Sequence, residues 1–117
     1  MKKLLIYDWK IEGSNENPYY SFVEKDKFNL KFCESFSQVM EAGKKDIDCI
    51  ISHYGIGFNK NIQKKIINNL PVISYRNSPE GVKIIKDFYK LFNLPDKDLY
   101  FVEKDRELGN LLGELFY

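Results

Sequence analysis

The chain has 117 residues, which is enough for one packed core and too short for two. Hydrophobic residues make up 44% and charged residues 30%, a balance typical of a globular domain rather than a disordered chain. The net charge of +1, from 18 basic and 17 acidic residues, gives no electrostatic reason to expect nucleic acid or an anionic membrane as the partner.

The N-terminal sequence MKKLLIYDW predicts a β-strand rather than a secretion signal, because Asp8 interrupts the apolar run and no small-residue cleavage site follows. No apolar run in the sequence approaches the length of a membrane span. Cys33 and Cys49 have neither CxxC nor metal-ligand spacing, and each falls in an apolar run. We therefore expect a cytoplasmic protein with two buried free thiols.

Short apolar runs alternate along the chain with amphipathic stretches. The apolar runs predict five β-strands, at 4–8, 28–34, 47–53, 71–75 and 99–103. The stretches between them predict helices. Two of these begin at Asn17-Pro18 and at Ser35, and two more span about 59–69 and about 79–93. A last helix closes the chain, with one apolar face formed by Leu108, Leu111, Leu112 and Leu115.

Strands that alternate with helices predict an α/β fold, a parallel sheet with right-handed connections and helices on both faces. For five short units in residues 1–117, we expect one domain with the flavodoxin-like strand order 2-1-3-4-5. The carboxyl ends of strands 1, 3, 4 and 5 then converge. They bring together Asp8, His53, the segment from Ser74 to Arg76, and Lys104.

This pattern resembles the receiver domain of two-component response regulators over essentially the whole chain, in the placement of Asp8, DCIISH, LPVISYRN and LYFVEKD. Receivers bind Mg²⁺ through an acidic pair at the end of strand 1, and an aspartate at the end of strand 3 accepts the phosphoryl group. They carry Thr or Ser after strand 4 and Lys after strand 5. The resemblance gives Asp8 the first acidic position and Lys104 the lysine position, with Asp105 in place of the usual proline. Phe101 matches the aromatic residue that receivers use as a rotameric switch.

Other positions depart from the receiver pattern. Trp9 replaces the second carboxylate, and His53 stands where the phospho-accepting aspartate belongs. Arg76 most nearly meets the Thr/Ser position, with Ser74 two residues earlier. Mg²⁺ prefers several hard oxygen ligands, so Asp8 alone is a poor site, and we expect neither Mg²⁺ binding nor aspartate phosphorylation. The resemblance therefore implies a pseudo-receiver, a signalling module that acts through contacts with another protein or as a homodimer.

Alternatives remain open at the strand ends. Histidine ordinarily titrates near neutrality, so His53 could serve a phosphocarrier or small enzyme, together with Asp8 and Lys104. If these residues have only a structural role, we expect His53 to form a hydrogen bond with Asp8 or a loop carbonyl, and Asp8 to form an ion pair with Lys104. A third alternative is a flavodoxin-like binder of a phosphorylated ligand, with Arg76 beside Lys104 and a Gly55-x-Gly57 loop before a helix.

In receivers, the face built from helix 4, strand 5 and helix 5 carries partner and dimer contacts. By that resemblance we expect a contact surface formed by Lys83, Lys86, Asp87, Lys90, Tyr100 and Arg106. The chain has too many tyrosines to bury them all, so some should enrich such a surface. The alternative is an ordinary solvated, charged face.

Overall fold

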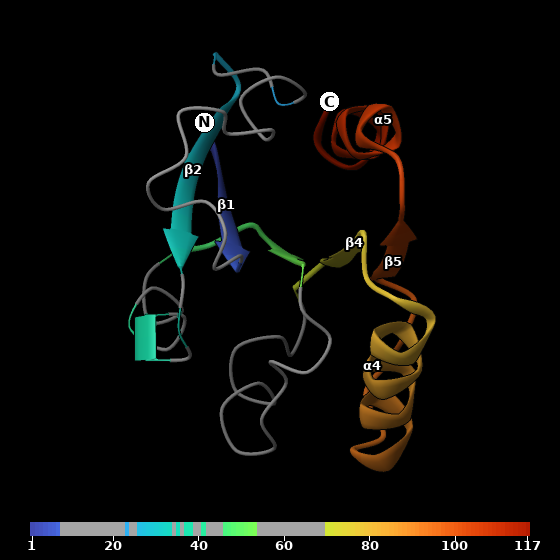
Figure 1. The fold of residues 1–117 in the computed structure, drawn as a ribbon. Helices are drawn as coiled ribbons and strands as arrows, with labels where there is room; N and C mark the ends of the chain where they lie inside the picture. Colours follow the sequence, from blue (N-terminus) through green and yellow to red (C-terminus); the bar gives the residue numbers. More distant parts are fainter. Residues whose placement is uncertain are drawn as a thin grey trace.

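The computed structural model describes residues 1–7, 23, 26–33, 35, 37–38, 41, 46–53 and 70–117. Its five strands form one sheet in which every neighbouring pair is parallel, in the order β2-β1-β3-β4-β5 (Figure 1). The predicted five-stranded parallel sheet is confirmed, and its strands are β1 (Lys2–Tyr7), β2 (Phe28–Cys33), β3 (Cys49–Ser52), β4 (Val72–Tyr75) and β5 (Leu99–Val102).

The register of the sheet brings the carboxyl ends of four strands to the same level. Ser52, the last residue of β3, pairs with Tyr7 on β1 and with Ser74 on β4. Tyr75 on β4 pairs in turn with Val102, the last residue of β5. The residues that directly follow β3, β4 and β5 therefore lie at one edge, called the carboxyl edge below.

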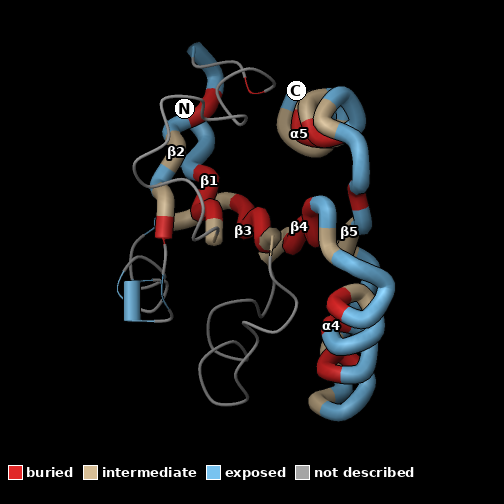
Figure 2. The backbone as a smooth tube through the Cα atoms, in the orientation of Figure 1, coloured by how far each residue is buried: buried red, intermediate tan, exposed pale blue. Residues whose placement is uncertain are grey.

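Both faces of the sheet are covered by apolar packing, because alternate residues of each strand point to opposite sides. One side holds a buried cluster built on Leu4, Ile51 and Ile73, and the other holds a cluster built on Leu5 and Ile50. β3 and β4 are consequently buried along their whole length, and β1 is buried at Leu4, Leu5 and Ile6 (Figure 2). Burial on both faces explains why their sequences are nearly continuous apolar runs.

Helix α4 (Pro79–Leu91) packs on the side of the sheet that carries Leu5. Its start matches the sequence signal, because Ser78 Oγ accepts a hydrogen bond of 3.1 Å from the Gly81 N–H, and Pro79 fills the first position. Ile85 and Phe88 are buried at helical spacing against the sheet. Asn93, at φ 51°, ends the helix in the left-handed conformation of a Schellman motif.

Helix α5 (Asp105–Phe116) packs on the opposite side, the side of Leu4, so the two described helices lie on different sides of β4 and β5 (Figure 1). Leu108 and Leu112 are completely or almost completely buried, as the spacing of the leucines predicts. At the end of the chain, the Tyr117 hydroxyl donates to the Lys27 carbonyl at 3.0 Å. This contact holds the carboxyl end of α5 against the start of β2.

Several predicted features lie outside the described residues, namely the helices expected after Asn17-Pro18 and at 59–69 and the Gly55-x-Gly57 loop. The predicted cap at Ser35 is present, because its Oγ accepts a hydrogen bond of 3.3 Å from the Gln38 N–H. Cys33 and Cys49 are buried free thiols, as expected. Among the helices of the described ranges, none combines the length and the apolar character needed to cross a membrane.

Candidate functional site

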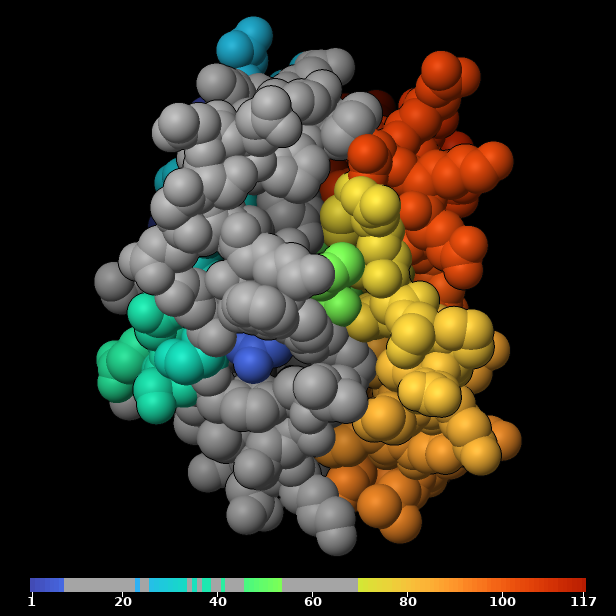
Figure 3. Space-filling view, in the orientation of Figure 1, coloured from blue at the N-terminus to red at the C-terminus, as the bar shows by residue number. Residues whose placement is uncertain are grey.

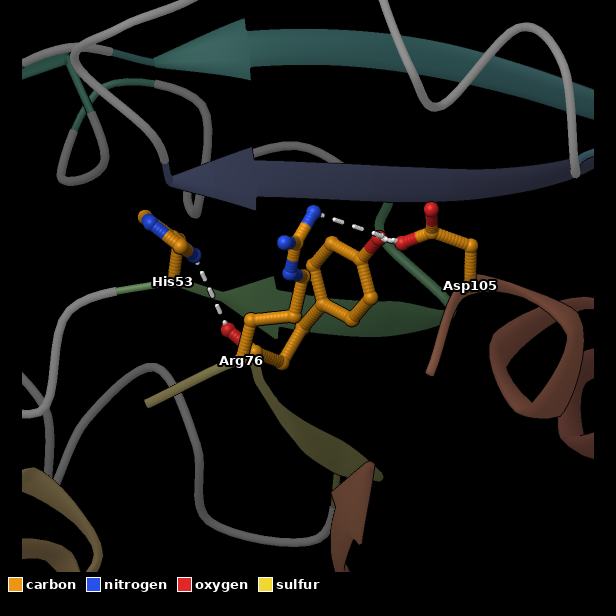
Figure 4. A network of polar contacts seen from close by, with 4 residues as sticks. His53, Arg76 and Asp105 are labelled. Atoms are coloured by element: carbon orange, nitrogen blue, oxygen red, sulfur yellow. Dashed lines mark hydrogen bonds and ion pairs between the residues drawn. The ribbon is translucent and has the colours of Figure 1, made fainter. Parts of the chain in front are cut away.

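His53 directly follows β3 at the carboxyl edge and is held there by two backbone groups. Its N–H donates to the Tyr7 carbonyl at 3.1 Å, and its ring Nδ1 lies 3.0 Å from the Tyr75 carbonyl oxygen (Figure 4). A carbonyl oxygen carries no proton, so Nδ1–H is the donor, and in the neutral ring the lone pair resides on Nε2. The acceptor for Nδ1–H is thus a strand carbonyl of β4, and the suggested bond to Asp8 stays a prediction because Asp8 lies outside the described residues.

Tyr75 connects this edge of the sheet to α5. Its ring is 2% exposed, so this tyrosine belongs to the core rather than to a contact surface. Its hydroxyl donates to the carboxylate of Asp105, and its ring centroid lies 6.3 Å from that of His53. One residue of β4 therefore holds His53 through its backbone and α5 through its side chain.

Asp105 makes two side-chain contacts that the sequence did not predict. Besides the Tyr75 hydroxyl, its Oδ1 lies 3.7 Å from an Nη of Arg76. Sequence reasoning noted Asp105 only as a replacement for proline. The available signal was its place in the first turn of a helix, where a negative charge is favoured by the helix dipole.

Arg76 is the first residue after β4, and its backbone is in a conformation that non-glycine residues adopt rarely. Its φ is 53°, in the left-handed region, which costs on the order of 1 kcal/mol for a residue with a Cβ. Its N–H donates to the Val102 carbonyl at 2.8 Å, which extends the pairing of β4 with β5. Arg76 therefore makes a long contact with Asp105 while 54% of its side chain stays exposed, and its expected place beside Lys104 stays a prediction.

Ser74 belongs to a second polar group, on the side of the sheet that faces α4. Its side chain is 1% exposed, and its Oγ accepts a hydrogen bond of 2.6 Å from the Asn77 side-chain amide. The same amide donates to the Ser52 carbonyl at 3.1 Å. Asn77 therefore joins the ends of β3 and β4, a role that no sequence signal indicated. The side chains of Ser74 and Arg76 therefore contact different partners, Asn77 and Asp105 respectively.

Lys104 occupies the cap position before α5, and its carbonyl accepts the Glu107 N–H at 3.0 Å. Its side chain is exposed and makes no hydrogen bond or ion pair with any residue that the structure describes. Asp8 and Trp9 lie outside the described residues, so the expected Asp8–Lys104 pair and a ligand role for Asp8 stay predictions. Within the described ranges, no three acidic, histidine or cysteine side chains come together as metal ligands.

Between α4 and β5 lies an open groove of about 690 Å³, called the α4–β5 groove below. Phe101 lines it with 38% of its surface exposed, and the Lys86 ammonium lies 5.1 Å from the centre of its ring. The groove brings together four of the six predicted surface residues with Phe101, namely Lys83, Lys86, Asp87 and Lys90. The remaining two lie elsewhere: Tyr100 packs against the α5-side core, and Arg106 is exposed on α5.

Comparison with known proteins gives no relative for this chain. No family model, no curated protein and no solved structure matches it.

Proposed function

We propose that this chain is a receiver-like regulatory module that binds another protein, or a second copy of itself, through the α4–β5 groove. In this proposal the fold is flavodoxin-like, with further helices from the segments near 18, 35 and 59–69 completing both faces of the sheet. The module acts without phosphorylation of an aspartate after β3. The observation that carries the proposal is the exposed Phe101 in a groove that three lysines also line.

The composition of the groove favours a protein partner of a particular kind. Aromatic side chains are enriched in protein interfaces, and Phe101 offers an apolar anchor point. Three lysines and two aspartates line the groove, including Lys83, Lys86 and Lys90. A segment that presents an apolar side chain between acidic ones would complement both the ring and the excess positive charge.

The carboxyl edge supports the second half of the proposal. β3 ends in Ser52 and is followed by His53, so the position that receivers use for phosphorylation carries a hydroxyl and an imidazole in place of a carboxylate. The backbone carbonyl of Ser52 accepts a hydrogen bond from the Asn77 side chain, and the His53 ring is bonded to the Tyr75 carbonyl on β4. An aspartyl phosphate cannot form where no aspartate is present. Regulation by contact therefore accounts for the residues at hand better than an aspartate phosphorylation cycle.

Quantitative affinity capture from the source cell tests the proposal, with a second, differently tagged copy of the chain expressed alongside. Wild-type protein should enrich a specific protein, or the second copy, and Phe101→Ser should lose it. Ile84→Ser is the matched control, because Ile84 is 40% exposed on α4 and does not line the groove. Equal capture by Phe101→Ser and Ile84→Ser would reject the groove as the binding surface, and capture of nothing by wild type would reject the function.

A further inference from the structure

We propose that the outer side of β5 binds an extended segment of another protein as an additional, antiparallel strand. In that segment an apolar residue lies opposite Phe101, and acidic residues occupy the neighbouring positions that face the α4–β5 groove. The inference rests on the proposed function, since it names the kind of partner and the way in which this groove holds it.

The first support is the place of β5 in the sheet. β5 has a neighbouring strand on one side only, because it is the last strand in the sheet order. Figure 1 shows it as the outermost strand, between α4 and α5, and in Figure 3 the atoms of α4 (yellow to orange) and α5 (red) lie on that side of the molecule. Phe101 is 38% exposed, so neither helix covers this strand completely.

The second support is the direction of the backbone groups of β5. The Arg76 N–H donates to the Val102 carbonyl at 2.8 Å, so the backbone of Val102 faces β4. Successive residues of a strand turn these groups to opposite sides, so those of Leu99 and Phe101 face away from β4. The Leu99 N–H is already bonded to the Asp96 carbonyl, at 3.1 Å. Among the described residues, Phe101 therefore offers both a donor and an acceptor to an added strand.

The third support is the composition of this strand. Proteins commonly protect an exposed sheet edge with charged residues or proline, and β2, at the other edge of the sheet, carries the exposed Asn29 and Lys31. β5 consists of Leu-Tyr-Phe-Val and has neither a charge nor a proline. An edge without such protection is a template for strand addition, a common way of binding an extended peptide.

The groove defines the side chains that such a segment needs. Leu99 and Phe101 both line it, so every second residue of an added strand would face into it. The Lys86 ammonium lies 5.1 Å from the centre of the Phe101 ring, and the three lysines of the groove outnumber its two aspartates. The ring favours an apolar side chain directly opposite, and the excess positive charge favours acidic side chains beside it.

A second copy of the chain fits this surface less well than a different protein does. Antiparallel pairing of two β5 strands through Phe101 would place both α4 helices on the same side of the joined sheet. Two grooves that each have an excess of lysine would then lie next to each other, and their like charges would repel. An acidic segment of another protein would instead neutralise the charge of the groove.

The probe is a capped synthetic peptide with the core Glu-Thr-Val-Thr-Glu, added to the isotope-labelled protein and followed by NMR. Binding should slow the hydrogen exchange of the Phe101 N–H about tenfold or more at saturation, because this group becomes a strand donor. The N–H of Tyr100, which faces β4, should change little. The isomer Thr-Glu-Val-Glu-Thr has the same composition but turns its carboxylates away from the groove, and it should bind about tenfold more weakly.

Methylation of single peptide nitrogens separates strand pairing from binding by side chains alone. N-methylation of the central valine removes the donor to the Phe101 carbonyl and should weaken binding about tenfold or more. N-methylation of the following threonine is the matched control, because its N–H points away from β5. This control peptide should bind as tightly as the unmodified one.

Four results would each overturn the inference: no binding of the unmodified peptide, equal binding of the two isomers, equal effects of the two methylations, or unchanged exchange at Phe101. Self-association that protects the Phe101 N–H without peptide would overturn the choice of a different protein. Capture of a partner that depends on Phe101, together with any of the four results, would leave the proposed function standing and reject only the added strand.

Discussion

The side-chain amide of Asn77 lies 2.6 Å from Ser74 Oγ, and Asn77 directly precedes Ser78, the N-cap residue of α4. The same amide reaches the Ser52 carbonyl at 3.1 Å, so one side chain joins the ends of two neighbouring strands. The hydroxyl is almost completely buried, and water cannot easily replace a lost donor. The carboxyl edge is therefore held by side chains as well as by the sheet.

Replacing Asn77 by alanine should lower the free energy of unfolding by about 1–3 kcal/mol, because it deprives buried groups of a donor. Urea unfolding monitored by circular dichroism measures this change. Asn110→Ala, at an exposed position on α5, is the matched control and should change stability by about 0.5 kcal/mol or less. Similar losses for the two variants would show that Asn77 does not join the strands in solution.

The left-handed backbone of Arg76 predicts that a glycine variant is more stable than an alanine variant at this position, the reverse of their order inside a helix. At φ 53° a Cβ is strained, so Arg76→Gly should be more stable than Arg76→Ala by about 1 kcal/mol. In the helical backbone of Arg106, glycine should instead be less stable than alanine by about 1 kcal/mol. Urea midpoints of the four variants measure both differences. The same order at both positions would contradict the left-handed conformation of Arg76.

The contact between the Tyr75 hydroxyl and Asp105 should appear as a coupling energy. In a double-mutant cycle, Tyr75→Phe and Asp105→Ala should be coupled by about 1 kcal/mol or more, because the acceptor is a charged group. The control cycle pairs Tyr75→Phe with Glu107→Ala, an exposed acid in the same first turn of α5. Its coupling should be near zero. A coupling in the control cycle as large as in the first would mean that the tyrosine senses general charge rather than this carboxylate.

Alkaline pH should destabilise the protein through Cys49. Burial, and next the charge of Asp48, raises the pKa of this thiol from 9.0 to about 12. The unfolded chain ionises first, so this contribution to stability is complete below pH 9 and is lost as the pH rises from 9 toward 12, by up to about 1.4 kcal/mol per pH unit. Cys33, Tyr7 and Tyr89 have pKa values raised by burial and act in the same direction.

Urea unfolding at about pH 8 and about pH 10.5 measures the effect in wild type and in Cys49→Ala. Both proteins should lose stability because the other buried groups remain, and the variant should lose less. Identical losses in the two proteins would contradict a buried, neutral thiol at this position.

Sequence patterns predict the five strands and helix α4 to within about two residues at their ends, and for α5 they predict its buried leucines, because these features depend on local periodicity and caps. The strand predicted at 47–53 illustrates the limit, since the ladder includes only Cys49–Ser52. Asp48 instead accepts the Lys3 N–H through its side chain, at 2.7 Å. Such an interaction depends on the neighbouring strand and leaves no trace in the local pattern.

The contacts of the candidate site are harder to predict from the sequence, because they too join residues that are distant in the chain. His53 stands out as the single histidine, but its partner is a backbone carbonyl, which every residue has. Asn77 contacts Ser52, which lies 25 positions earlier in the chain, and Asp105 contacts Tyr75, which lies 30 positions earlier. Tyr100 and Arg106 are close in sequence to Phe101, yet the alternation of β5 and the turn into α5 take them to another side of the sheet.

The binding role of the α4–β5 groove is tested by the equilibrium affinity for the captured protein or second copy, measured by calorimetry on wild type, Lys86→Glu and Lys97→Glu. Lys97 is an exposed lysine that does not line the groove. Reversing the charge beside Phe101 should weaken binding about tenfold or more, equivalent to about 1.4 kcal/mol, whereas Lys97→Glu should leave it nearly unchanged. Equal affinities for the two variants would contradict a partner that occupies this groove.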